Sequence, residues 1–365
     1  MNIYDYMDQY GCYSFEEKPI NEVDCVIFSF LSYADFDHIV ENKKISLKDV
    51  GRMHLGLHKK GEKNVMAVRE ATKMLTYMKD TKRYRDCSLF HYVYESTKDY
   101  QFSAISIEYQ KNRVFVSYEG TDQMISGWKE NFLLSYSFPT ITHTRAIEYL
   151  NRFYTFSLKK LIVGGHSKGG NLALVASMCC NSFARSHIKM VYNMDGPGLL
   201  DKEFRSKRFR RILPKYKQII PEDSIVGIML YSSNVEVIHS KATGILSHNV
   251  AYWEVEKDHF KKDRLSSFSK ELKKGLLGYL DTHTPDELKT VIFNLDKVCQ
   301  KAGVSNLNEF KTDTHKIIDF IKACSCLNIE SRNMLYDLLN IVIKALGDSK
   351  HRDFVEFVKK FKLDI

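Results

Sequence analysis

The feature that most constrains the fold is a tight turn with a serine at its apex, Gly165-His166-Ser167-Lys168-Gly169. The apolar run Leu161–Val163 precedes the turn and predicts a strand, and the alanine- and leucine-rich run 171–176 follows it and predicts a helix. A serine at such a junction stands above the sheet edge, beside the N–H groups that begin the helix. The pattern predicts that Ser167 is a nucleophile, and the competing interpretation is a glycine-rich turn with an inactive serine.

A nucleophilic serine needs a histidine base, which in turn needs an orienting acid. Among the histidines that follow Ser167, His248 is the preferred base. It lies beyond the last predicted strand, in the glycine-containing loop 244–249, which can bring an imidazole over the edge of the sheet. His239 is the alternative base.

Asp195 is the preferred acid because it directly follows the predicted strand Ile188–Met194. A carboxylate there stands at the carboxyl edge of the sheet, where ligand sites of α/β folds form. The alternative is that Asp195 only caps its own turn. Glu236, which follows a second predicted strand at Ser224–Tyr231, is the alternative acid.

The oxyanion of an acyl-transfer reaction needs two N–H donors. The first is expected to be the amide of Lys168, the residue after the nucleophile. The second is expected at Thr121, because Gly120 permits close backbone approach in the loop after the predicted strand Val114–Tyr118.

Predicted strands that alternate with predicted helices indicate an α/β fold with a mainly parallel central sheet. Residues 1–100 are predicted to be mostly helical, and a hairpin near residue 110 adds antiparallel strands at one edge. Thr284-Pro285 is typical of a helix start, and further helical spacing appears at Ile317–Cys326, Met334–Leu346 and Phe354–Phe361. We therefore expect an α/β-hydrolase domain over 1–260 and an α-helical region over 261–365.

Composition adds few constraints. Of the 365 residues, 44% are hydrophobic. The sequence contains no uninterrupted stretch of 18 apolar residues, so no membrane span is expected. The eight cysteines form neither a CxxC pair nor a zinc-binding spacing, and the acidic N-terminus does not resemble a signal peptide. These features favour reduced thiols in a cytoplasmic protein, and no metal or cofactor is expected.

The net charge of +9 is concentrated in residues 202–218, where eight lysines and arginines stand against Glu203. Such a run predicts either a solvated helix face or peripheral contact with an anionic membrane. Nucleic-acid binding is not expected, because no aromatic stacking pattern or known module accompanies the charge.

Several segments resemble class 3 lipases: the strand end Tyr118–Thr121, the elbow Gly165–Ala173 and a histidine shortly before Tyr252-Trp253. Together with the segments 127–132, 193–198 and 224–227, they make the first 260 residues or so more similar to a family of bacterial lipase-like α/β-hydrolases. The class 3 pattern implies an acid near position 234, where this chain has Asn234. The segment 194–197 resembles the acid-bearing segment of animal pancreatic-type lipases, which favours Asp195. Glu119 stands where class 3 lipases carry arginine.

The resemblance implies a serine hydrolase that cleaves an ester of a lipid or another acyl substrate. Ser167 would attack, His248 would move the proton, and Asp195 would orient His248. The alternative is a non-catalytic binding or scaffold protein that acts through its basic segment and helical tail. The sequence does not indicate an oligomeric state.

Overall fold

The structure is a computed structural model that describes residues 1–40, 43–57, 66–97, 100–120, 133–303 and 314–346. The chain divides into two compact units. The first comprises residues 1–122 and 139–265, and the second comprises 123–138 and 266–365. Each unit is described by itself.

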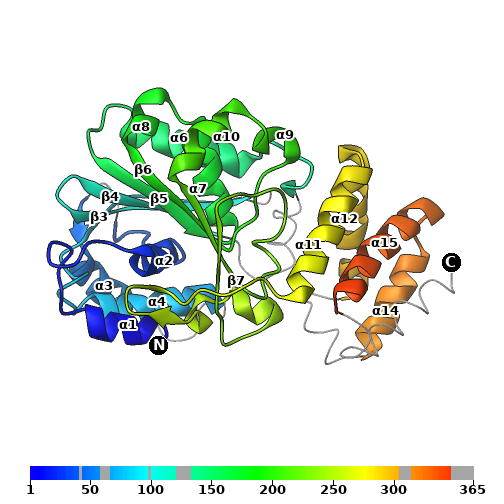
Figure 1. Cartoon of the computed structure of the whole chain (residues 1–365), viewed down its shortest axis with the longest axis horizontal. Helices are drawn as coiled ribbons and strands as arrows, with labels where there is room; N and C mark the ends of the chain where they lie inside the picture. The colour runs from blue at the N-terminus through cyan, green and yellow to red at the C-terminus, as the bar shows by residue number, and fades with distance from the viewer. Residues whose placement is uncertain (41–42, 58–65, 98–99, 121–132, 304–313, 347–365) are drawn as a thin grey trace. The chain divides into compact units, whose positions relative to one another are not determined.

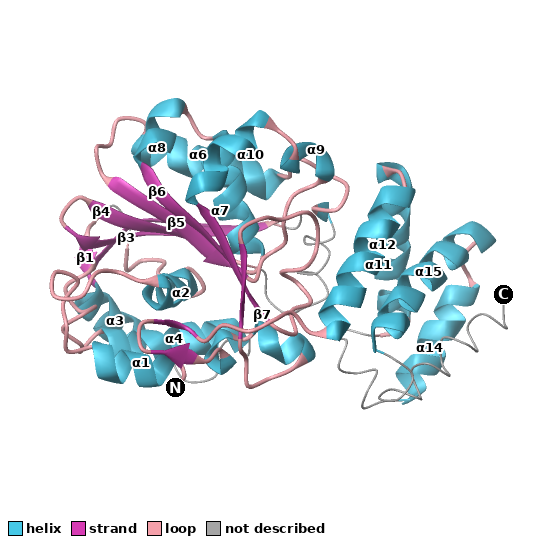
Figure 2. Ribbon diagram, viewed as in Figure 1, coloured by secondary structure: helices cyan, strands magenta, loops and turns pink. Residues whose placement is uncertain are grey.

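The first unit is built on an eight-stranded sheet whose strands lie in chain order (Figures 1 and 2). Strands β1 to β4 pair antiparallel, and β4 to β8 pair in parallel. The expected α/β fold with antiparallel strands at one edge is confirmed. The strands are β1 (Ile45–Ser46), β2 (Ser88–Ser96), β3 (Gln101–Gln110), β4 (Arg113–Tyr118), β5 (Lys160–His166), β6 (Ile188–Met194), β7 (Tyr216–Pro221) and β8 (Val235–Ile238).

The order of the parallel strands decides which helices cover which face. Every crossover from β4 to β7 advances in the same direction, and right-handed crossovers then place their helices on one face. Figure 1 shows α6 to α10 on that face and α1 to α4 on the other. The first layer is α6 (Ile141–Tyr154), α7 (Lys168–Cys179), α8 (Ser182–His187), α9 (Asp201–Phe204) and α10 (Lys207–Ile212). The second is α1 (Ile3–Tyr10), α2 (Glu22–Leu31), α3 (Leu47–Leu57) and α4 (Met66–Met78).

The N-terminal layer is held by a buried ion pair as well as by apolar packing. The Arg83 guanidinium donates to both oxygens of Asp24, at 2.8 and 2.6 Å, and both side chains are fully buried. The Tyr6 and Tyr84 hydroxyls donate to the same carboxylate. Asp24 lies in α2 and Arg83 follows α4, so the ion pair joins these two segments. Removing either partner would leave an uncompensated buried charge.

The structure differs from two expectations about secondary structure. The region 1–100, expected to be mostly helical, also contains strands, because β2 occupies Ser88–Ser96 and forms an antiparallel ladder with β3. Ser224–Tyr231 is not a strand; of its residues only Tyr231 makes a β-bridge, with Leu199. This segment folds into turns around Asp195, and Leu230 has a positive φ of 65° that no strand tolerates.

The second unit is helical within its described residues. Its helices are α11 (Ser267–Thr282), α12 (Pro285–Lys301), α14 (Thr314–Ser325) and α15 (Ile329–Leu346). Thr284 caps α12, where its hydroxyl accepts from the Glu287 N–H and the Glu287 carboxylate accepts in return. Residues 133–138 group with these helices, and Phe354–Phe361 lies outside the described residues.

Two further observations concern membrane spans and cysteines. Among the described residues, no helix has the length and apolarity needed to span a bilayer. All eight cysteines are free thiols.

Candidate active site

Ser167 lies at the junction of β5 and α7, in a backbone conformation that few residues adopt. Its φ is 58° and its ψ is −134°, which is strained for a residue with a side chain. The Ser167 N–H donates to the Met194 carbonyl at 2.9 Å, and the Ser167 carbonyl accepts from the Gly170 N–H. The neighbouring strand and the first turn of α7 therefore hold the strained turn on both sides.

Glycines allow two backbones to approach this turn. A Cβ on Gly169 would lie 2.1 Å from the Tyr118 carbonyl oxygen, so α7 can pass close to the end of β4 only without a side chain there. A Cβ on Gly120 would lie 2.1 Å from the Tyr33 hydroxyl and 3.0 Å from the Ser167 Cβ. Gly120, just after the end of β4, thus lies directly against the serine.

The two expected oxyanion donors are in different situations. Lys168 is the first residue of α7, at the helix N-terminus, which carries partial positive charge. Its side chain is buried, and its Nζ donates to the Gln101 carbonyl at 3.2 Å, so the ammonium is held by protein atoms. Thr121 lies outside the described residues, and Gly120 is the last described residue before it.

Asp195 lies directly after β6 in a left-handed conformation, with a φ of 49°. Its carboxylate is fully buried and accepts from three donors. The Ser224 hydroxyl and the Gly227 N–H donate to Oδ1 at 2.5 and 3.1 Å. Oδ2 lies 2.6 Å from His248 Nδ1. The structure therefore brings Asp195 and His248 together, and the two segments 193–198 and 224–227 meet at this carboxylate.

His248 ends a short 3-10 helix, η2 (Gly244–His248). The Ser247 hydroxyl donates to the Asp223 carbonyl at 3.2 Å, and Trp253 Nε1 donates to the Ser247 carbonyl at 2.8 Å. Because Nδ1 faces a carboxylate, a neutral ring carries its proton on Nδ1 and keeps Nε2 free to accept one.

Sequence reasoning gave no role to His166, the residue before the serine. Its ring centroid lies 4.3 Å from that of His248, and its Nε2 lies 2.9 Å from the His248 carbonyl oxygen. A carbonyl only accepts, so Nε2 carries the proton and Nδ1 accepts from the Tyr33 hydroxyl at 3.1 Å. Burial, and then the nearby His248 charge, lower the pKa of His166 well below 6.5, and the ring is therefore neutral.

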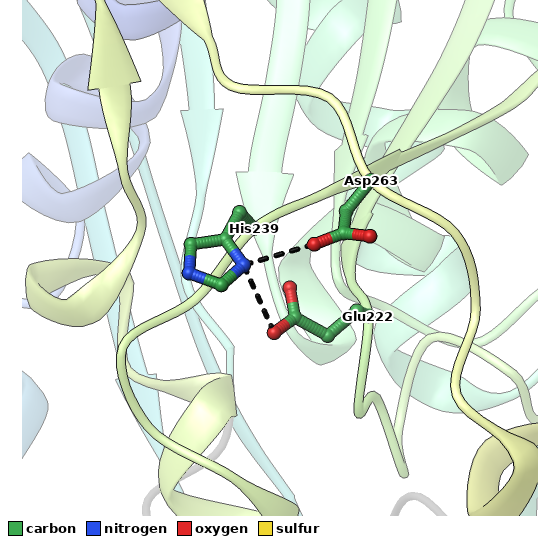
Figure 3. Close-up of side chains that lie close together, drawn as sticks. All are labelled: Glu222, His239 and Asp263. Atoms are coloured by element: carbon green, nitrogen blue, oxygen red, sulfur yellow. Dashed lines mark hydrogen bonds and ion pairs between the residues drawn. The ribbon is translucent and has the colours of Figure 1, made fainter.

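The alternative site residues have other partners. Glu236 lies in β8 and pairs with Lys217 at 3.1 Å and with Lys262 at 3.6 Å. His239 Nδ1 lies 3.1 Å from Glu222 Oε1 and 2.9 Å from Asp263 Oδ2 (Figure 3).

Asn234, at the position of the class 3 acid, is a turn residue here. Its φ is 51°, and its amide donates to the Leu213 and Tyr216 carbonyls at 3.0 and 3.1 Å. The side chain is therefore committed to the turn before β8.

Buried amide side chains, which sequence reasoning also missed, hold the turn that carries Asp195. Asn193 Oδ1 accepts from the Gly196 N–H at 2.8 Å, and Asn171 Nδ2 donates to the Gly198 carbonyl at 2.6 Å. Gln218 Nε2 donates to the carbonyls of Gly196 and Gly227, both at 2.8 Å. Buried amides can fix a turn this way because every polar atom finds a partner. The only sequence signal was a polar amide within a largely apolar element, which is a helix for Asn171 and a strand for Asn193 and Gln218.

The basic segment 202–218 is not one helix face. It runs through α9, α10, a 3-10 turn and β7, and several of its cations already have partners. Arg205 pairs with Asp201 at 2.7 Å, and Lys217 pairs with Glu22 at 2.6 Å. Six cations are exposed: Lys202, Arg205, Lys207, Arg208, Arg210 and Arg211.

Comparison with known proteins identifies a family that matches this sequence. A family model described as Mbeg1-like matches residues 78–297 of the chain. Among curated proteins, none matches the sequence. A solved structure described as the crystal structure of M37 lipase overlaps 55% of this chain and 68% of that chain, with 14% identity and a TM-score of 0.34. This likeness is too weak to support a structural argument about the chain.

Proposed function

The chain belongs to the Mbeg1-like family, which is lipase-like, and on that premise we propose that it is a serine hydrolase acting on esters. The substrate class would be a lipid or another acyl ester. The observation that carries the proposal is the 2.6 Å contact between Asp195 Oδ2 and His248 Nδ1, at the edge of the sheet that carries Ser167 in its strained turn.

The proposed reaction has two halves. Ser167 Oγ attacks the ester carbonyl while His248 Nε2 takes the hydroxyl proton, and Asp195 stabilises the imidazolium that forms. The proton then passes to the departing alcohol as the acyl-enzyme forms. In the second half, water attacks the acyl group, His248 again accepts the proton, and the acid is released with Ser167 restored.

Charge develops on the carbonyl oxygen in both halves. The Lys168 amide at the start of α7 is suited to stabilise it, because the helix N-terminus carries partial positive charge. The amide of Thr121 is proposed as the second donor. Gly120, its neighbour in the chain, supports this choice, since its missing side chain lets the backbone at residue 120 lie against Ser167.

A fluorophosphonate probe tests the proposal directly, because it reacts with an activated serine. The parent chain should be labelled at Ser167, and Ser167→Ala should not be labelled. Ser177→Ala is the matched control: this buried serine lies on the same helix, and its Oγ has no hydrogen-bond partner. If the folded parent is not labelled, the proposal is wrong and the binding-protein hypothesis is preferred. Esters of graded chain length would then define the acyl preference of a labelled protein.

A further inference from the structure

A second cluster of polar side chains lies at the end of the parallel part of the sheet. Glu222 directly follows β7, His239 directly follows β8, and Asp263 lies three residues beyond β10 (His259–Phe260). Figure 3 shows both carboxylates directed at one nitrogen of the His239 ring. His239 Nδ1 lies 3.1 Å from Glu222 Oε1 and 2.9 Å from Asp263 Oδ2.

Backbone hydrogen bonds between the three segments make the cluster a fixed one. Each of the three residues donates its N–H to a carbonyl of a neighbouring segment, so the side chains project from a continuous ladder. The bonds run from Glu222 to Ile238 at 2.9 Å, from Asp263 to Val237 at 2.9 Å and from His239 to Lys261 at 2.8 Å.

Each carboxylate is also oriented by a second contact. Glu222 Oε2 accepts from the Ser240 N–H at 2.8 Å, and Asp263 Oδ1 accepts from the Arg264 N–H at 2.7 Å. These bonds occupy one oxygen of each carboxylate and turn the other toward His239. Outer partners of this kind orient the ligands of metal sites.

A single hydrogen bond does not account for both contacts to His239 Nδ1. Nδ1 carries at most one proton, yet two carboxylate oxygens face it. Glu254, a third carboxylate, lies 3.7 Å from the other ring nitrogen, Nε2, and is also paired with Lys261 at 3.0 Å. Glu222 and Asp263 therefore share a single imidazole as their ion-pair partner.

The separations are close to those around one metal ion. Two ligand atoms about 2.1 Å from a tetrahedral zinc ion lie about 3.4 Å apart, so the 3.1 and 2.9 Å contacts of His239 Nδ1 would lengthen by only a few tenths of an ångström on binding. The three atoms here all lie within 4.8 Å of one another. One imidazole nitrogen with two carboxylate oxygens is a donor set for zinc and other first-row divalent ions, whereas Ca²⁺ and Mg²⁺ prefer oxygen alone.

We propose that Glu222, His239 and Asp263 bind one divalent transition-metal ion, with Zn²⁺ the best fit to this donor set. The three ligands leave further positions for water. The ion has a structural role, because it fastens the ends of β7 and β8 to the segment after β10.

The position of the site gives the ion a second consequence. Glu222 begins the turn whose Ser224 hydroxyl donates to Asp195, and His239 begins the segment that ends at His248. A hydrogen bond links these two segments, because the Asp223 carboxylate accepts from the Gly244 N–H. A bound ion therefore stiffens the two segments that hold the Asp195–His248 pair.

The test measures Zn²⁺ binding to the full chain after chelator treatment, by metal analysis and by the Zn²⁺ dependence of Tm. The parent should hold one ion per chain, and its Tm should rise with Zn²⁺ because the ion binds the folded state. Glu222→Gln and His239→Ala should each lose that rise. His259→Ala should keep it; this control removes a histidine that also faces a carboxylate, Asp258 at 3.2 Å.

Two further measurements keep the result unambiguous. Co²⁺ in place of Zn²⁺ should show no sulfur-to-metal charge-transfer band, which separates this site from the free thiols. Ca²⁺ and Mg²⁺ at the same concentration should leave Tm unchanged. The proposal is overturned if Zn²⁺ has no effect on the parent, if the rise survives in both ligand variants, or if Ca²⁺ raises Tm as much. Ser167→Ala should bind Zn²⁺ like the parent, so the result is independent of the proposed hydrolysis.

Discussion

The imidazole of His166 lies against that of His248, with ring centroids 4.3 Å apart, and its Nε2 bonds to the His248 backbone carbonyl. One ring thus fixes both the backbone and the ring plane of the other. The residue before the nucleophile is in this way a positioning residue for the proposed base.

The first prediction concerns this contact. His166→Phe keeps a ring in place but removes the bonds to His248 and Tyr33. We expect kcat for a soluble ester to fall by about 10-fold with KM nearly unchanged, because misorientation of the base affects the reacting geometry. His187→Phe is the control, since that ring contacts Phe183 and Ser186 on its own helix. Equal kcat values for parent and His166→Phe would remove the positioning role.

The second prediction separates the two candidate acids. Oδ1 of Asp195 accepts two N–H or O–H donors, so the oxygen of an asparagine would take that place and its NH₂ would face Nδ1 of His248. The proton would then reside on Nε2, which could no longer accept one. We expect Asp195→Asn to lower kcat by about 10³-fold to 10⁴-fold.

Glu236→Gln is the comparison for Asp195→Asn. Glu236 forms partly exposed ion pairs with Lys217 and Lys262, and such pairs contribute about 1 kcal/mol or less. Turnover should change little. A greater loss in Glu236→Gln than in Asp195→Asn would show that the acid is on β8. Initial rates with one ester suffice for both variants.

The third prediction concerns the backbone approach at Gly120. A Cβ there would overlap the Tyr33 hydroxyl and the His166 carbonyl oxygen, so Gly120→Ala must displace the loop from Ser167. Displacement by about 1 Å can reduce turnover by about 100-fold.

Gly278→Ala in α11 is the matched control for Gly120→Ala. A Cβ at Gly278 meets nothing within 4 Å, and alanine favours a helix by up to about 1 kcal/mol. Its Tm should be equal to or above that of the parent, with unchanged turnover. Full turnover by Gly120→Ala would contradict the proposed role of this loop.

The fourth prediction is a pH dependence of stability. His143 Nε2 contacts Asn171 Oδ1 at 2.7 Å, and Nδ1 accepts from the Thr140 N–H. Burial lowers the pKa of His143 from 6.5 to about 4. The unfolded chain therefore binds the proton more readily, and the free energy of unfolding falls as the pH drops below about 6.5.

The size of this effect can be measured against a variant. The difference in pKa corresponds to on the order of 3 kcal/mol, lost by about pH 4. Urea unfolding of the parent and of His143→Gln should show a smaller loss in the variant between pH 6.5 and pH 4.5. Parallel curves would mean that His143 titrates alike in the folded and unfolded chains.

The fifth prediction concerns the basic segment. Arg208, Arg210 and Arg211 are exposed on α10, and near an anionic surface each contributes about 1 kcal/mol to binding. Replacing all three with Gln should weaken binding to phosphatidylserine vesicles and spare turnover of a soluble ester. Raising salt should have the same effect, since exposed charges are screened within about 10 Å at 0.1 M. Vesicles of neutral lipid are the control. If vesicle binding is unaffected by the triple substitution and by salt, the basic segment is only a solvated surface and not a membrane contact.

Features that depend on neighbours along the chain could be predicted from the sequence alone. The strand Ile188–Met194 has the expected bounds, and Thr284 caps α12 because its partner Glu287 is three residues away. The strand, turn and helix around Ser167 could be predicted for the same reason, since glycine spacing and apolar periodicity are local signals.

Contacts between side chains that are distant in the sequence depend on the folded chain and could not be predicted in this way. Ser224–Tyr231 is apolar enough for a strand, but its Ser224 hydroxyl and Gly227 N–H serve Asp195, and a buried carboxylate without such donors would be strongly unfavourable. The choice between Asp195 and Glu236 as the partner of a histidine, and the meeting of Glu222, His239 and Asp263, likewise depend on strand register. Register is a property of the whole sheet, set by packing on both faces, and no short stretch of sequence contains it.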